Sequence, residues 1–186
     1  SMNLNEFRDC VRQEFRFLIE DYDYAEVPLP DEEFINEFMV CFSNGRTWIG
    51  IEGINWGFAI DVRLASVDPT IMRYPDYCLG DLLAMRHPAF EPITAKGTDT
   101  RDIQKRQLNQ FAEELRIHAA DVLRGKFDSF PQLAKAIDDR QAAWEREVAN
   151  KIGIGVSLAA EPLPHHPACG SAPGGSFPRS ELLPDC

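Results

Sequence analysis

Three apolar runs separated by two glycine-containing reversals lie in residues 38–65, which read FMVCFSNGRTWIGIEGINWGFAIDVRLA. Asn44-Gly45 stands between the first two runs. This dipeptide is the strongest short-range hairpin signal, because both central residues of a two-residue type I′ turn need positive φ. Such a loop predicts that Phe42 lies opposite Thr47. The third run alternates between two faces, with Phe58, Ile60, Val62 and Leu64 on one and Ala59, Asp61, Arg63 and Ala65 on the other. The stretch therefore predicts an antiparallel meander of three to four strands with one apolar face.

Helical periodicity flanks the meander on both sides. Apolar residues at steps of three and four predict a helix over residues 3–24, and Asn3 with Glu6 resembles a capping box at its start. Two further helices are expected at about residues 100–124 and 129–150, joined by a short loop. We expect them to form an antiparallel pair that packs on one sheet face. The sequence thus predicts an α+β fold with an N-terminal helix, the meander and a C-terminal helix pair.

The length of 186 residues fits one domain, and the composition divides the chain near residue 152. We expect a single α+β domain over residues 3–152. Residues 153–186 contain six prolines and five glycines with little periodic apolar content. This composition predicts a disordered tail.

The chain is acidic, with a formal net charge of −11. This charge argues against direct binding to nucleic acid and against docking on anionic membranes, and it is compatible with a basic protein partner. No apolar run approaches the roughly 20 residues that span a bilayer. Charged residues interrupt the N-terminus instead of forming a signal peptide, and no CxxC pair occurs among five scattered cysteines. We therefore expect a cytoplasmic protein.

The most unusual local feature is an acidic run at residues 20–37, which contains eight Asp and Glu residues and no Lys or Arg. One interpretation is a solvated helix end and loop, the usual state of a charge run. The other is a surface for a basic partner, since tyrosines within the run are favoured at interfaces. On the second interpretation the candidate partner-binding residues are Asp21, Tyr22, Asp23, Tyr24, Glu26, Asp31, Glu32 and Glu33.

Catalytic and metal-binding motifs are weak in this chain. His165-His166 with Cys169 has ligand-type residues, but zinc normally takes four ligands at paired spacings, so we interpret this group as incidental. His87 and His118 are expected to be structural or surface residues. The sequence contains no GxSxG, HExxH, P-loop or GxGxxG motif. We expect no catalytic residue, no metal and no cofactor, and a protein that is not an enzyme.

Two stretches carry a family resemblance. The hairpin followed by Asn55-Trp56-Gly57-Phe58, and residues 118–133, HAADVLRGKFDSFPQL, resemble small cytoplasmic bacterial proteins of the polymorphic-toxin immunity type. The similarity covers about residues 3–150. It implies a binder that neutralises a cognate toxin by occluding it. Acidic proteins of this type commonly face basic nuclease toxins, which agrees with the acidic run.

Two other functions stay open. A small-molecule-binding or enzymatic domain would place its site between the sheet and the helices, with Trp48, Asp61 and Arg63 as candidates. A pocket lined by Asp61, Arg63 and a histidine would favour this function, whereas a filled apolar interface would not. A structural or assembly subunit is the third possibility, for which a stable homodimer would be the first sign.

Overall fold

The α+β fold class is confirmed in a computed structural model, which describes residues 1–31, 36–94 and 100–152. A single antiparallel sheet has the strand order β1-β2-β3-β4-β5. Its strands are β1 (Ala25–Val27), β2 (Met39–Ser43), β3 (Thr47–Gly53), β4 (Ala59–Ser66) and β5 (Tyr77–Cys78). The helices are α1 (Leu4–Glu14), α2 (Phe17–Tyr22), α3 (Ile54–Gly57), η1 (Pro69–Ile71), α4 (Leu79–Arg86), α5 (Thr100–His118), α6 (Ala120–Leu123) and α7 (Phe130–Ile152). The expected disordered tail, residues 153–186, lies outside the described residues.

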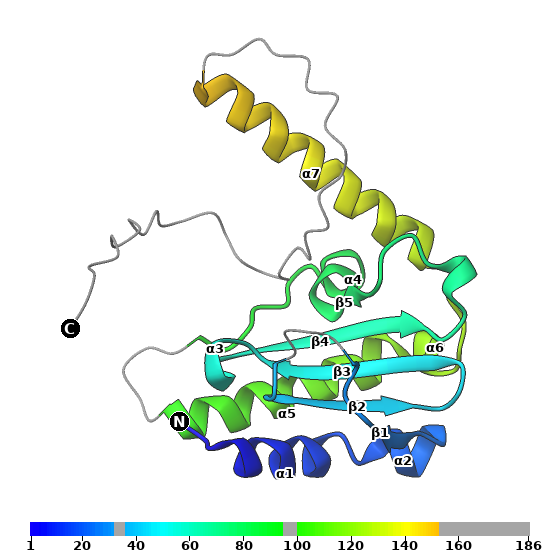
Figure 1. The fold of residues 1–186 in the computed structure, drawn as a ribbon, viewed down its shortest axis with the longest axis vertical. Coiled ribbons are helices and arrows are strands. Elements are labelled where there is room, and N and C mark those ends of the chain that lie inside the picture. The colour runs from blue at the N-terminus through cyan, green and yellow to red at the C-terminus, as the bar shows by residue number, and fades with distance from the viewer. Residues whose placement is uncertain (32–35, 95–99, 153–186) are drawn as a thin grey trace, which may run out of the picture.

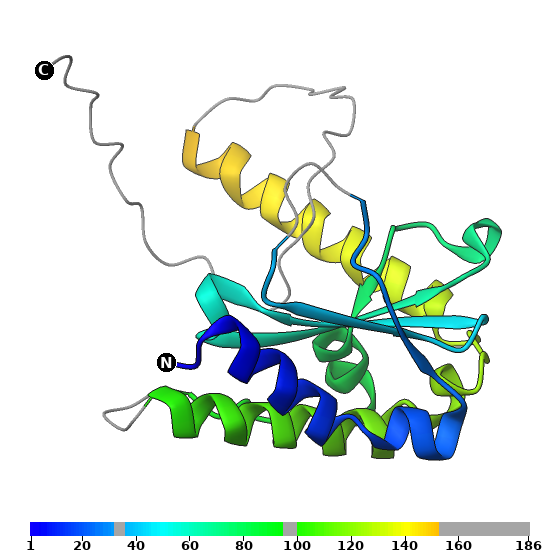
Figure 2. The same ribbon diagram turned by 60° about the horizontal axis from the view of Figure 1, so that its bottom comes forward.

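Helices α1 and α5 lie side by side against one face of the sheet, as Figures 1 and 2 show. The alternation of β4 turns Ile60, Val62 and Leu64 toward these helices, as expected, and all three are buried. The helices contribute a complementary apolar stripe to the same core, including Phe7, Val11, Leu108 and Leu115. The helices therefore cover the apolar face predicted from the sequence, but Phe58, expected on the same face, precedes β4 and is 49% exposed.

The β2–β3 hairpin forms at the expected place but with a different register. Phe42 pairs with Ile49 instead of Thr47, so the strands are joined by a longer turn. The side chain of Asn44 explains the longer turn, because its Oδ1 accepts hydrogen bonds from the amides of Arg46 and Thr47 at 3.0 and 2.9 Å. The shift is by two residues, and side chains alternate with a period of two. Each residue therefore keeps the face that the sequence predicts.

The hairpin turn also caps a helix. The Thr47 hydroxyl donates to the carbonyl of Val122 at 2.7 Å, and Nδ2 of Asn44 donates to the carbonyl of Leu123 at 3.1 Å. Both carbonyls belong to the last residues of α6, where a helix lacks internal donors. Asn44 and Thr47, which shape the hairpin turn, thus also attach it to α6.

The single N-terminal helix expected over residues 3–24 is broken into α1 and α2 at Phe15 and Arg16. The capping box is confirmed: Oδ1 of Asn3 accepts from the Glu6 amide, and Oε2 of Glu6 accepts from the Asn3 amide. The break reorients the chain so that Phe15, Phe17 and Leu18 are all buried. A straight helix would place Phe15 and Phe17 about 200° apart around its axis, which no single face can bury.

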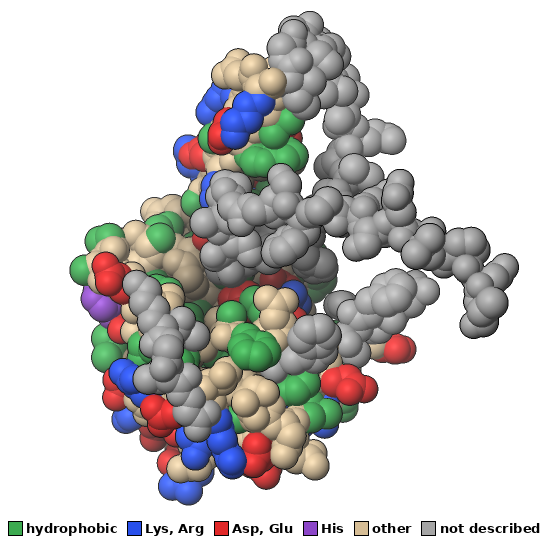
Figure 3. Space-filling model, turned by 90° about the vertical axis from the view of Figure 1, so that its left-hand side faces the viewer, with side chains coloured by type: hydrophobic (Ala, Val, Ile, Leu, Met, Phe, Trp, Pro, Cys, Tyr) green, Lys and Arg blue, Asp and Glu red, His purple; other side chains and the backbone are tan. Residues whose placement is uncertain are grey.

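Helix α7 leaves the body of the molecule instead of lying along α5 (Figure 1). Its first turns contact α4 and β5, and Arg140 forms an ion pair with Asp81 of α4 at 2.5 Å. Beyond this ion pair the helix is largely exposed, and the side chain of Trp144 is 58% exposed. Figure 3 shows hydrophobic, acidic and basic side chains mixed on the projecting end.

Candidate functional site

The acidic run passes along the β1 edge of the molecule. It begins in α2, on the helical side of the sheet, and crosses the sheet edge as β1 (Figure 2). The candidates Glu32 and Glu33 lie outside the described residues. The described part of the run therefore extends from the helical side of the sheet, past β1, to the opposite side.

Four candidate residues in this run are exposed: Asp21, Asp23, Glu26 and Asp31. Asp21 lies 3.7 Å from a guanidinium nitrogen of Arg116, and both side chains are at least half exposed, so this ion pair is weak. Asp23 and Asp31 have no cationic partner among the residues that the structure describes. These carboxylates are available to an external cation.

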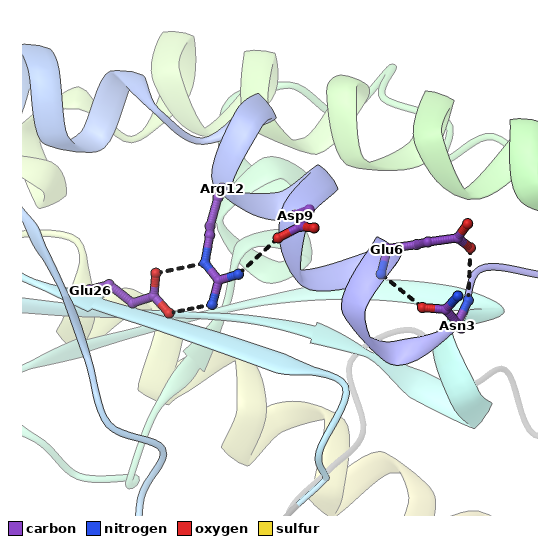
Figure 4. A network of polar contacts seen from close by, with 5 residues as sticks. All are labelled: Asn3, Glu6, Asp9, Arg12 and Glu26. Carbon is purple, nitrogen blue, oxygen red and sulfur yellow. Dashed lines mark hydrogen bonds and ion pairs between the residues drawn. The ribbon is translucent and has the colours of Figure 1, made fainter.

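Glu26 is not available in the same way, because its carboxylate is already paired. Arg12 of α1 donates from Nε and Nη2 to the two carboxylate oxygens of Glu26, each at 2.9 Å, and also contacts Asp9 (Figure 4). This bidentate hydrogen bonding is the main cause that lowers the pKa of Glu26. Glu26 therefore ties the edge strand to α1, and a partner would have to compete with Arg12 for it.

The two tyrosines of the run also contact the body of the protein. Tyr22 is half-buried, with its ring 6.2 Å from that of Phe17 and 5.1 Å from the guanidinium of Arg124. Tyr24 is only 3% exposed, and its hydroxyl donates to the carbonyl of Leu123 at 3.1 Å. Burial is the main cause that raises its pKa. The expectation that Tyr24 is an exposed contact residue is wrong, because the αL turn at Asp23 directs the next residue into the core.

Replacing Tyr24 with phenylalanine tests this structural role. The substitution removes the buried hydroxyl and keeps the ring, so we expect the free energy of unfolding to fall by about 0.5–1.5 kcal/mol. The loss stays small because the Leu123 carbonyl keeps its hydrogen bond from Asn44. Urea unfolding measures it. An unchanged free energy of unfolding would show that the hydroxyl is dispensable to the fold.

A second polar group lies on the sheet face away from α1 and α5. Asp61 is 6% exposed, and its neighbour Arg63 forms ion pairs with Glu52 at 3.1 Å and Asp76 at 3.7 Å. Trp48, on the same face, packs over Gly50, where an added Cβ would lie 2.6 Å from the indole. No histidine joins Asp61 and Arg63 in the described part of the chain, and buried apolar side chains fill the interface between the sheet and the helices. These contacts do not support a small-molecule site there.

One group of metal-ligand side chains was missed by the sequence reasoning. His87, Glu114 and His118 each offer a ligand atom, and these atoms lie within 4.8 Å of one another. His87 is distant in sequence from the other two, so spacing alone does not reveal it. The spacing of Glu114 and His118 could have indicated part of this group, since residues four apart share a helix face.

Comparisons with family models, with curated proteins and with solved structures found no match to this chain. Among the residues that the structure describes, no helix combines the length and the apolar character needed to cross a membrane.

Proposed function

We propose that this protein is a non-enzymatic inhibitory binding protein that neutralises a basic protein, such as a nuclease toxin, by occluding it. The observation that carries the proposal is the set of exposed carboxylates of Asp21, Asp23 and Asp31, which flank β1 in the chain. We call these three residues the acidic edge. Glu32 and Glu33, which lie outside the described residues, follow Asp31 in the sequence.

The geometry favours contact through side chains over contact through strand addition. β1 is a terminal strand of the sheet, but it has only three residues. Pro28 and Pro30 follow it, and proline cannot donate a ladder hydrogen bond. The charges of the acidic edge are therefore the features that a partner would recognise.

Electrostatics supports a basic partner. A protein with a net charge of −11 attracts a cationic protein over a Debye length of about 8 Å at physiological salt. Complementary charge mainly accelerates association and selects the right partner. Rapid capture is the property that a toxin inhibitor requires.

The proposal is tested first in cells with the product of the neighbouring gene, because inhibitors and their toxins are commonly encoded side by side. Expressed alone, that product should arrest growth, and co-expression of this protein should restore it. A neighbouring product that causes no arrest, or an arrest that this protein does not relieve, would contradict the proposal.

Neutralising the acidic edge should weaken binding to that product. We expect the triple variant Asp21→Asn, Asp23→Asn, Asp31→Asn to bind roughly 10-fold more weakly at low salt, mainly through slower association. The difference should shrink as ionic strength rises, because salt screens exposed charges. Association kinetics at two salt concentrations measure both effects.

A matched control removes three charges elsewhere. Glu91→Gln, Glu145→Gln, Glu147→Gln changes exposed carboxylates in the loop after α4 and on α7. Helix α7 projects from the opposite end of the molecule from α2 (Figure 1). Equal losses in both triple variants would show that net charge, and not the acidic edge, governs binding.

A further inference from the structure

We propose that His87, Glu114 and His118 form a metal site of the zinc type, with three protein ligands and an open fourth position. His87 directly follows the last residue of α4, and the other two lie four residues apart near the end of α5. Nδ1 of His87 lies 2.8 Å from Oε2 of Glu114, and Nε2 of His118 lies 3.4 Å from the same oxygen. The three ligand atoms therefore converge from two helices on one point.

A small adjustment of the side chains would bring these ligand atoms to the separations of a tetrahedral zinc ion. Zinc binds histidine nitrogen and carboxylate oxygen at about 2.0–2.1 Å, so neighbouring ligands of a tetrahedral ion lie about 3.4 Å apart. The distance from His118 to the Glu114 oxygen equals that value, whereas the 2.8 Å from His87 is a direct hydrogen-bond distance and is shorter. All three ligand atoms lie within 4.8 Å of one another. Two histidines with one glutamate are also a known three-ligand set for zinc, in which water fills the fourth position.

The surrounding contacts fix the backbone beneath the ligands. Arg86 forms a bidentate ion pair with Asp121 at 2.6 and 2.7 Å, and it donates to the carbonyl of His118 at 2.6 Å. These bonds hold the end of α4 against the end of α5. The two imidazole rings lie face to face, with centroids 4.8 Å apart and planes inclined by 27°. With the helix ends held together in this way, an ion would replace the direct contact between His87 and Glu114 through movement of their side chains.

The site is shielded but reachable. The Glu114 side chain is 15% exposed, that of His118 is 24% and that of His87 is 38%. A hydrated cation can therefore approach past His87, while the carboxylate stays largely protected from water. The competing explanation is a metal-free cluster in which Glu114 accepts hydrogen bonds from both rings. Metal titration separates the two.

The test uses the full-length chain, freed of metal with a chelator and titrated with Zn²⁺ by calorimetry. We expect one saturable equivalent, and a melting temperature that rises with Zn²⁺ because the ion binds the folded state. Co²⁺ titration provides a visible spectrum that reports nitrogen and oxygen ligands. The double variant His87→Asn, His118→Asn removes two ligands. Its Zn²⁺ affinity should therefore fall by more than the roughly 10- to 100-fold that is typical when only a hydrogen-bond partner of a ligand is lost.

Two further variants keep the test decisive. Glu114→Gln keeps the shape of the side chain but removes its charge, so it should also weaken Zn²⁺ binding. This variant tests the proposal even if the double histidine variant fails to fold. The chain has four histidines, and the other two, His165 and His166, provide the control. Replacing both with asparagine should leave binding unchanged. Absence of saturable binding, or loss of binding only in this control, would overturn the proposal.

Discussion

Replacing Phe7 with alanine is expected to lower the free energy of unfolding by about 3–5 kcal/mol, because the change empties a filled position of the core. Phe7 is fully buried between α1 and the sheet. Its ring lies 5.6 Å from that of Phe38, and an added Cβ on Gly53 would meet it at 3.0 Å. The backbone of β3 therefore packs directly on this ring, which leaves few ways to close the cavity.

Urea unfolding measures the effect as a lower midpoint with an unchanged slope. Phe58→Ala is the matched control, since the same substitution is made at a side chain that is 49% exposed. We expect a loss of less than about 1 kcal/mol there. The sequence predicts that Phe58 shares the buried face of β4. Similar losses of unfolding free energy in Phe7→Ala and Phe58→Ala would support that prediction and contradict the structure.

Much of the fold could be predicted from the sequence, because short-range patterns govern it. The alternation of β4 and the Asn3–Glu6 capping box depend only on neighbouring residues, and both are found in the structure. Strands β1 and β5 were missed because they have three and two residues, too few to show a period. The hairpin register was wrong because the Asn44 side chain competes with the two-residue turn.

The candidate site was less predictable, because its charges are paired over long range. Nothing near Glu26 in the sequence indicates that Arg12 neutralises it, and nothing near Tyr24 indicates that Leu123 accepts its hydroxyl. His87 and Glu114 are brought together only by the packing of α4 on α5. Local sequence therefore identified an acidic segment but not which of its side chains stay free.

Burial raises the pKa of Asp61 from the ordinary value of 3.8 to about 7, although the positive charge of Arg63 acts in the opposite direction. Between pH 3.8 and 7, Asp61 is therefore protonated in the folded protein but ionised in the unfolded chain. Stability should accordingly fall as the pH rises through this window, and the loss is complete above pH 7. The full shift corresponds to a loss on the order of 4 kcal/mol.

Asp61→Asn removes the titrating group, so its free energy of unfolding should not show this fall. Urea unfolding at pH 4, 5.5, 7 and 8.5 should show the variant close to the wild type at pH 4 and more stable by a few kcal/mol at pH 8.5. Asp68→Asn is the control of opposite sign, because hydrogen bonds from Thr70 lower the pKa of Asp68. That variant should be the less stable protein at neutral pH and match the wild type in acid. A pH-independent difference for Asp61→Asn would show that the buried carboxyl titrates as it does in the unfolded chain.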